Sequence, residues 1–188
     1  MNDAAQKDII RKNINEKRKK LDPFNKNKFD RKIFEVLLQL PEWKNAKNIL
    51  MYVSHSYEVD THMLIRTHLD EKNIVVPKTH KIDNTLILHK ISTFNELKKG
   101  NFKILEPVSH TKKIDPKDID LAVIPGVAFD LKGQRVGYGK AYYDNLIPNL
   151  NCRKIGLAYS FQIVDNVPAE KHDQPVDLLI TEDQTHIF

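Results

Sequence analysis

The stretch that decides the fold is Ile119-Asp-Leu-Ala-Val-Ile-Pro125, which continues into Gly126-Val-Ala-Phe-Asp130 and then Gly133-Gln-Arg-Val-Gly-Tyr-Gly139. Residues 119–125 form an almost unbroken apolar run that ends at a proline, which is typical of a strand buried on both faces of a parallel sheet. Three of the six glycines of the chain lie between positions 133 and 139. A buried strand followed by a glycine-rich loop predicts a layered α/β protein whose loop backbone approaches a ligand closely.

Similar apolar runs lie on both sides of this strand. They cover residues 48–54, 74–77, 85–91, 154–160 and 177–181. Between them, the segments 61–71 and 139–146 are predicted to be helices, with Thr61 as the N-cap of the first. The most polar stretch, 109–117, is expected to be a surface loop.

Two helices are predicted before the first strand. Residues 4–21 have a few apolar side chains at helical spacing and a wide charged face. Asp22 suits an N-cap and Pro23 a first helical position, so a second amphipathic helix is expected from there until Pro41 closes it. The sequence therefore predicts one α/β domain over residues 1–188, with a layered, mostly parallel sheet flanked by helices and two N-terminal helices.

The composition is that of a soluble globular protein, with 40% hydrophobic and 29% charged residues in 188. The single cysteine, Cys152, allows no internal disulfide and is expected to be structural. No apolar run approaches the 18 residues of a membrane span, and the N-terminus lacks a signal-peptide pattern. We therefore expect a cytoplasmic protein with no membrane partner.

The positive charge is concentrated at one end of the chain. Residues 1–20 carry seven basic and three acidic side chains, a balance of +4 out of the net +5. A basic helix of this kind is compatible with a phosphorylated small molecule and also with RNA.

The glycine-rich segment has the composition of an anion site. A helix beginning near Gly139 would direct its positive end at a phosphate, and Lys140 and Arg135 would add two cations. Asp144, four residues after Lys140, would share its helical face and hold Mg²⁺ on the phosphates. The P-loop and dinucleotide templates both fail, because Ala141 follows the lysine and Tyr142 stands where a third glycine is required. A tight turn with solvated charges remains an alternative for the isolated motif.

The segment resembles the signature of the 5-formyltetrahydrofolate cyclo-ligase family, also called methenyltetrahydrofolate synthetases. In that family, Pro-Gly-x-Ala-Phe-Asp leads to Gly-x-Arg-hydrophobic-Gly-x-Gly-x-Gly-Tyr-Tyr-Asp. The sequence matches with residues 125–130 and 133–144. One position departs, because Ala141 replaces the third glycine of the family motif. A methyl group there is expected to be compatible with helical backbone angles.

Further family blocks cover nearly the whole chain. Lys7 and Arg11 match a Lys-x-x-x-Arg pair that contacts ATP, and Glu58 matches a folate-contacting glutamate, with Val53 lining the same pocket. Gly100 to Pro107 resembles Gly-x-x-Gly-Ile-x-Glu-Pro, with Lys103 in place of the second glycine. Asp173 matches a metal-associated aspartate, and the neighbouring His172 is either a ligand or a loop histidine.

The resemblance implies an ATP-dependent ligase of one-carbon metabolism that converts 5-formyltetrahydrofolate to 5,10-methenyltetrahydrofolate with release of ADP and phosphate. It implies catalytic roles for Lys140, Arg135 and Tyr143. ATP would be bound by Lys7, Arg11, Arg135, Gly137, Tyr138, Gly139, Lys140, Ala141, Tyr142 and Tyr143. The folate would be bound by Val53, Glu58, Tyr138, Gly139, Lys140, Ala141 and Tyr142, and Mg²⁺ by Asp144 and Asp173. Of Tyr142 and Tyr143, one is expected in the site.

Two other functions were weighed. A nucleic-acid-binding module would use the cations Lys12, Lys17, Arg18, Lys19 and Lys20, but no aromatic residue is interleaved with them as a stacking platform. A sugar-phosphate isomerase of similar fold would not explain two spaced aspartates. We therefore expect a monomer that binds ATP and 5-formyltetrahydrofolate, with or without a polyglutamate tail, and no nucleic acid.

Overall fold

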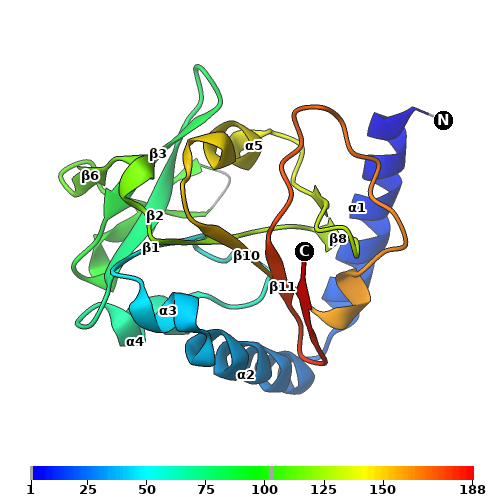
Figure 1. Cartoon of the computed structure of the whole chain (residues 1–188), viewed down its shortest axis with the longest axis horizontal. Coiled ribbons are helices and arrows are strands. Elements are labelled where there is room, and N and C mark those ends of the chain that lie inside the picture. The colour runs from blue at the N-terminus through cyan, green and yellow to red at the C-terminus, as the bar shows by residue number, and fades with distance from the viewer. Residues whose placement is uncertain (1, 102–103) are drawn as a thin grey trace.

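An eight-stranded mixed sheet forms the centre of the protein, in the order β12-β11-β10-β7-β1-β2-β3-β6 (Figure 1). The computed structural model describes residues 2–101 and 104–188. The sheet consists of β1 (Asn48–Met51), β2 (Asn73–His80), β3 (Thr85–Lys90), β6 (Lys112–Ile114), β7 (Leu121–Ile124), β10 (Arg153–Leu157), β11 (Leu178–Ile180) and β12 (Thr185–Ile187). Two small ribbons lie outside it: β4 (Leu97–Lys99) with β5 (Leu105–Pro107), and β8 (Ala128–Phe129) with β9 (Arg135–Val136).

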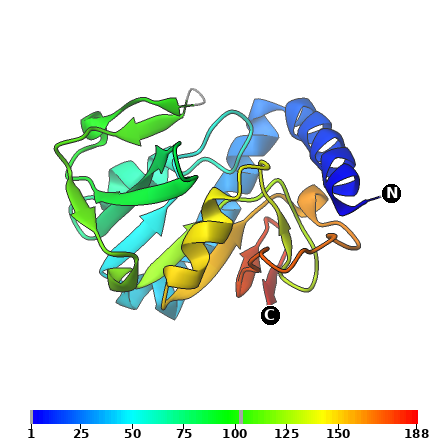
Figure 2. The same ribbon diagram turned by 90° about the horizontal axis from the view of Figure 1, so that it is seen from above.

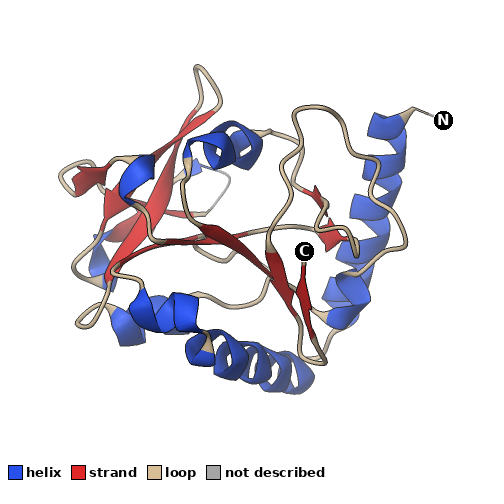
Figure 3. Cartoon of the chain, viewed as in Figure 1, coloured by secondary structure: helices blue, strands red, loops and turns tan. Residues whose placement is uncertain are grey.

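Helices cover both faces of this sheet (Figure 3). The α-helices are α1 (Asp3–Lys20), α2 (Pro23–Gln39), α3 (Pro41–Asn45), α4 (His62–His68) and α5 (Tyr142–Leu146). Short 3-10 helices are η1 (Phe94–Glu96), η3 (Pro116–Asp118), η4 (Ile147–Asn149) and η5 (Ser160–Gln162). Helices α2, α3 and α4 pack on the face that includes Ile49 and Met51 of β1, whereas α5 and η4 pack on the face of Leu50. Alternating residues of one strand thus enter two separate apolar cores.

The central strands are parallel and the outer strands are not. β1 pairs with β2 and β7, and β10 pairs with β7 and β11, all in parallel. β2–β3, β3–β6 and β11–β12 are antiparallel. The predicted α/β class with flanking helices is therefore confirmed, with antiparallel strands added at both edges. Residues 109–117, expected to be a loop, include strand β6, so that expectation was wrong.

The two N-terminal helices are as predicted, and a further short helix, α3, follows α2 at Pro41. Asp22 caps α2 by accepting hydrogen bonds from the backbone N–H groups of Phe24 and Asn25 at 3.0 Å. Pro41 ends α2 and also begins α3, because proline is well suited to a first helical position. Helix α1 stands beyond the end of the sheet, beside β8 (Figure 2). Ile14 anchors it there in a small apolar cluster with Val136 and its neighbours.

Two predicted helices are shorter than expected. The segment 139–146 becomes helical only at Tyr142, because Ala141 has left-handed backbone angles, φ 53° and ψ 15°. The segment 61–71 is helical from His62 to His68. Thr61 does not cap it: its hydroxyl donates to the carbonyl of Tyr52, and Asp60 accepts from the N–H of His62 instead.

Candidate active site

A cavity of about 570 Å³ opens at the carboxyl ends of the central parallel strands. Tyr52 and Val53, which follow β1, and Pro125, which follows β7, form its floor. Ligands of open α/β sheets bind outside the carboxyl ends of the strands, and this volume is typical of small-molecule sites.

Every residue that the sequence placed in an ATP, folate or metal site lines this one cavity. The fourteen are Lys7, Arg11, Val53, Glu58, Arg135, Gly137, Tyr138, Gly139, Lys140, Ala141, Tyr142, Tyr143, Asp144 and Asp173. They come from α1, from the loop after β1, from the segment between β9 and α5 and from the loop before β11. The individual roles of these residues remain predictions.

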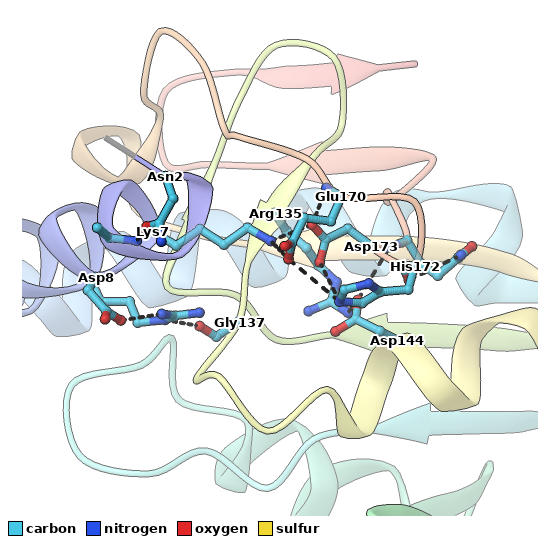
Figure 4. A network of polar contacts seen from close by, with 12 residues as sticks. Asn2, Lys7, Asp8, Arg135, Gly137, Asp144, Glu170, His172 and Asp173 are labelled. Carbon is cyan, nitrogen blue, oxygen red and sulfur yellow. Dashed lines mark hydrogen bonds and ion pairs between the residues drawn. The ribbon is translucent and has the colours of Figure 1, made fainter.

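Lys7 extends from α1 to two carboxylates on the opposite wall (Figure 4). Its ammonium group lies 2.5 Å from Asp173 Oδ2 and 2.9 Å from Glu170 Oε2, and its side chain is only 8% exposed. Burial opposes the charged form, but the hydrogen bonds to Asp173 and Glu170 outweigh it and raise the pKa of Lys7 above its ordinary value. Lys7 is therefore a buried, paired cation and not a solvated surface charge.

Arg11 fixes the glycine loop to the same helix. Its Nε donates to the carbonyl oxygen of Gly137 at 2.8 Å, and its Nη1 lies 2.5 Å from Asp8 Oδ1. Lys7 and Arg11, one helical turn apart, thus reach two different walls of the cavity.

Arg135 and Asp144 form a largely buried ion pair between β9 and α5. Arg135 Nη2 donates to Asp144 Oδ1 at 2.6 Å, and the two side chains are 3% and 14% exposed. Burial lowers the pKa of Arg135, and the charge of Asp144 opposes that shift. The Nε of Arg135 has no hydrogen-bond partner among the described residues. Its guanidinium group is thus only partly satisfied by protein atoms.

The loop before β11 gathers three groups that can bind a cation. Single ligand atoms of Glu170, His172 and Asp173 lie within 4.8 Å of one another. Asp173 Oδ2 also accepts from the backbone N–H of Glu170 at 2.7 Å. Burial would raise the pKa of Asp173, but this bond and Lys7 lower it overall. His172 Nε2 lies 3.7 Å from Glu170 Oε2 and 3.9 Å from Asp173 Oδ1.

The predicted helix N-terminus at Gly139 was wrong. Gly139 has φ 86° and Ala141 φ 53°, so the chain turns at both positions and Lys140 lies in an extended loop before α5. Lys140 and Asp144 therefore do not share a helical face. Among the described residues, the exposed Lys140 has no ion-pair partner. It enters the cavity as a free cation on a curved loop.

Glu58 is a buried carboxylate on the other side of the cavity. Its Oε1 accepts from the hydroxyl of Tyr138 at 2.7 Å, and its Oε2 accepts from the backbone N–H of His55 at 2.7 Å. The residue is 7% exposed. Each carboxylate oxygen can accept more than one hydrogen bond, so Glu58 can still bind a ligand with two adjacent donors.

Both tyrosines after Ala141 line the cavity, although only one of them was expected in the site. The hydroxyl of Tyr143 is buried and has no hydrogen-bond partner among residues 2–101 and 104–188. Burial raises the pKa of Tyr143, so its phenol stays a neutral donor. The helix α5 that carries them begins at Tyr142, three residues later than the predicted start at Gly139.

Sequence reasoning missed a second buried carboxylate in the cavity wall. Glu106 of β5 accepts from the hydroxyl of Thr79 at 2.5 Å, and Asn101 in turn donates to that hydroxyl at 2.7 Å. The match of Glu106 to the Glu-Pro pair of the family block was the feature of the sequence that could have indicated it. Lys103, the replaced glycine of that block, lies outside the described residues.

Two other expectations concern features outside the cavity. Cys152 is partly buried, and burial raises the pKa of its thiol to about 11, which supports a structural role. Across the described part of the chain, no helix is both long and apolar enough to span a bilayer.

The fold and the cavity define a class: an α/β protein with one cavity, lined by both cations and carboxylates, at the end of a parallel sheet. The family model described as the 5-formyltetrahydrofolate cyclo-ligase family matches residues 3–182. The chain belongs to this family.

Relatives in two kingdoms support the match. The chain is 35% identical over 169 residues to a probable 5-formyltetrahydrofolate cyclo-ligase of Schizosaccharomyces pombe, covering 79% of this chain and 81% of the relative. It is 32% identical to the 5-formyltetrahydrofolate cyclo-ligase of Haemophilus influenzae, covering 91% and 95%. The NMR structure of Aquifex aeolicus 5,10-methenyltetrahydrofolate synthetase superposes with a TM-score of 0.87 at 36% identity, covering 96% and 92%.

Proposed function

We propose that this chain is an ATP-dependent 5-formyltetrahydrofolate cyclo-ligase, which closes the folate to 5,10-methenyltetrahydrofolate and releases ADP and phosphate. The observation that carries this proposal is the convergence of all fourteen expected site residues on one cavity of about 570 Å³. The cavity has a cationic side suited to phosphates and a carboxylate side suited to a pterin.

The reaction requires activation of a poor leaving group. The formyl oxygen of the substrate attacks the γ-phosphorus of ATP, and the bond to the bridging oxygen of ADP breaks. N10 then attacks the formyl carbon, loses its proton and expels the oxygen as inorganic phosphate. The second step is intramolecular, so correct positioning supplies much of its rate. It needs no covalent enzyme nucleophile.

Three cations support the phosphate half of the site. Lys140 has no protein partner among the described residues, and Arg135 is only partly satisfied by Asp144. Arg11 holds the carbonyl of Gly137 and so shapes the loop on which the phosphates would lie. Loose phosphoryl-transfer transition states are stabilised chiefly by such positioned charge.

The folate half rests on Glu58, with Val53 beside it. The aminopyrimidine edge of a pterin presents adjacent N–H donors, which a single carboxylate binds in a bidentate manner. The hydrogen bonds from Tyr138 and His55 hold the Glu58 carboxylate in one orientation before any ligand arrives. Such preorganisation lowers the entropy lost on binding.

Magnesium is the metal that fits the donor set. Asp144 and Asp173 each use one carboxylate oxygen in the bonds described above and keep Oδ2 and Oδ1, respectively, without a hydrogen bond to a described residue. Carboxylate oxygens next to phosphates are the usual Mg²⁺ ligands. A bound ion would neutralise phosphate charge, and these two aspartates would hold it.

We also propose that the chain acts as one domain spanning residues 1–188, as a cytoplasmic monomer without nucleic-acid or membrane partners. Burial of Arg18 in the protein interior supports the absence of a nucleic-acid role, since it removes one cation from the basic face of α1. Polyglutamate tails on the folate are compatible with the remaining exposed lysines of that helix.

The test is an absorbance assay. The protein, 5-formyltetrahydrofolate and Mg-ATP at neutral pH should produce the near-ultraviolet absorbance of the methenyl product, with one ADP and one phosphate released per product. Folded protein that forms no product, or forms it without ATP consumption, would remove the assignment.

A binding experiment tests the folate half separately. Glu58→Ala should weaken binding of 5-formyltetrahydrofolate by about tenfold or more and leave ADP affinity within about twofold of wild type. Glu35→Ala, which removes an exposed carboxylate of α2 outside the cavity, is the matched control. Equal folate affinity in wild type and Glu58→Ala would remove Glu58 from the site.

A further inference from the structure

We propose that Arg18 is a positioning residue for the folate half of the site, acting through Tyr138 to hold the carboxylate of Glu58. The inference rests on the proposed function, because it takes Glu58 as the folate ligand. Arg18 itself does not line the main cavity; it lies behind it, on α1.

Arg18 is buried and rigidly held. The residue is 4% exposed. Its Nη2 donates to the carbonyl oxygen of Gly126 at 2.6 Å, and its Nη1 donates to the hydroxyl of Tyr138 at 3.0 Å. Arg18 therefore ties α1 both to the loop after β7 and to the glycine-rich loop.

The hydrogen bond from Arg18 to Tyr138 determines the direction of the hydrogen bond between Tyr138 and Glu58. A guanidinium group can only donate hydrogen bonds, so the Tyr138 oxygen accepts from Arg18 and its own proton is left to donate. That proton is directed at Glu58 Oε1, 2.7 Å away. Burial and the charge of Glu58 raise the pKa of Tyr138, so the phenol keeps this proton. In the series Arg18–Tyr138–Glu58, each residue therefore donates its hydrogen bond to the next.

The buried charge of Arg18 is explained only by the hydrogen-bonded series Arg18–Tyr138–Glu58. Among residues 2–101 and 104–188, no carboxylate forms an ion pair with Arg18, and its Nε has no hydrogen-bond partner. A buried cation without an ion pair is costly, and an apolar side chain would fill the space at lower cost. The acidic group that Arg18 reaches is Glu58, through one phenol.

This arrangement gives Glu58 its orientation. One carboxylate oxygen is held by Tyr138 and the other by the backbone N–H of His55, so rotation of the carboxylate breaks a bond on either side. The hydrogen bonds of Arg18 reach Tyr138 and Gly126 and none of the described cations on the phosphate side, so we expect nucleotide affinity to depend little on Arg18.

The experiment measures affinity for 5-formyltetrahydrofolate and for ADP in Arg18→Met and Arg18→Lys. Methionine keeps the length and packing and removes the charge and donors, whereas lysine keeps the charge. We expect Arg18→Met to weaken folate binding about tenfold, Arg18→Lys to recover part of that loss, and both to keep ADP affinity within about twofold. Lys17→Met, an exposed neighbour on α1, should change neither.

A double-mutant cycle separates positioning from general destabilisation. In a Glu58→Gln background, Arg18→Met should weaken folate binding by less than about twofold, because its effect passes through the carboxylate. The full tenfold loss in that background, or equal losses for folate and ADP, would overturn the proposal. If Arg18→Met does not fold, Arg18→Gln takes its place in the same cycle.

Failure of this inference and failure of the proposed function are distinguishable. Unchanged folate affinity in Glu58→Gln itself would remove Glu58 from the folate site and the proposed pocket with it. Weak folate binding in Glu58→Gln together with wild-type binding in Arg18→Met would overturn the role of Arg18 alone.

Discussion

Ala141 has a backbone conformation that residues with a side chain rarely adopt. Its angles, φ 53° and ψ 15°, lie in the left-handed region, and they reverse the chain immediately before α5. The sequence predicted helical angles here, because alanine favours helices. The observed left-handed angles are ones that glycine adopts without strain, whereas the methyl group of Ala141 makes them unfavourable.

Replacing this alanine with glycine should stabilise the fold. The left-handed conformation costs alanine about 1–2 kcal/mol, part of which is offset by the greater entropy of glycine in the unfolded chain. We expect Ala141→Gly to raise the free energy of unfolding by about 0.5–1 kcal/mol in urea denaturation. Ala5→Gly, in helix α1, should lower it. A lower stability of Ala141→Gly would show that the methyl group makes compensating contacts.

Lys140 is the cation whose removal should affect turnover most cleanly. Because it has no ion-pair partner in the described part of the chain, its substitution leaves no unpaired protein carboxylate. We expect Lys140→Ala to lower kcat about a hundredfold, chiefly through lost positioning of the phosphates. Lys132→Ala, which removes an exposed lysine outside the cavity, is the control and should retain wild-type kcat. A kcat of Lys140→Ala within twofold of wild type would contradict the role.

Burial of charged residues was the part of the site that the sequence did not predict. Lys7, Ile14 and Arg18 are the buried residues of α1. They are spaced by seven and four residues, so all three lie on one face of the helix. A search for apolar residues at helical spacing finds only Ile14 among them. The position of Arg18 on the same helical face as Ile14 was the feature of the sequence that could have indicated its burial.

At the scale of elements, the central strands were predictable and the edges were not. β7 is a continuous apolar run because both faces of the sheet are covered by helices. β6 is only three residues long, Lys112–Ile114, and has two exposed lysines, so its sequence resembles a loop. It becomes a strand because β3 offers a free edge, a tertiary effect that local sequence does not contain.

The β3–β6 edge should make stability depend on pH. His89 of β3 is 2% exposed, and its Nδ1 lies 2.9 Å from Thr111 Oγ1. Burial lowers the pKa of His89 below its ordinary value of 6.5, so the folded protein binds fewer protons at this site than the unfolded chain. Neutral His89 contributes to the free energy of unfolding at pH values above its ordinary pKa. This contribution is lost as the pH falls through the lower pKa of the folded state.

Urea denaturation at several pH values tests this edge. The free energy of unfolding should fall more steeply for wild type than for His89→Gln between about pH 7 and pH 5, because glutamine does not titrate. His110→Gln, which removes another histidine of the chain near this edge, should behave as wild type. Parallel pH profiles for wild type and His89→Gln would contradict the assignment.

At the scale of the whole molecule, the site is an assembly of segments far apart in sequence. Lys7 meets Asp173 across 166 residues, and Tyr138 meets Glu58 across 80. No local motif predicts such contacts; the family resemblance grouped the residues, and the parallel sheet explains why they meet. The carboxyl ends of β1 and β7 lie side by side, so the loops that follow them enclose one cavity.

We propose that ATP phosphorylates the formyl oxygen within this cavity, and the transfer of an oxygen isotope is a direct test of this step. The substrate labelled with ¹⁸O in its formyl group is converted with Mg-ATP at neutral pH, and the released phosphate is analysed by mass spectrometry. We predict one ¹⁸O atom in each phosphate, because the formyl oxygen leaves bonded to phosphorus. Methenyl product formed with unlabelled phosphate, and the label recovered in water, would contradict the mechanism.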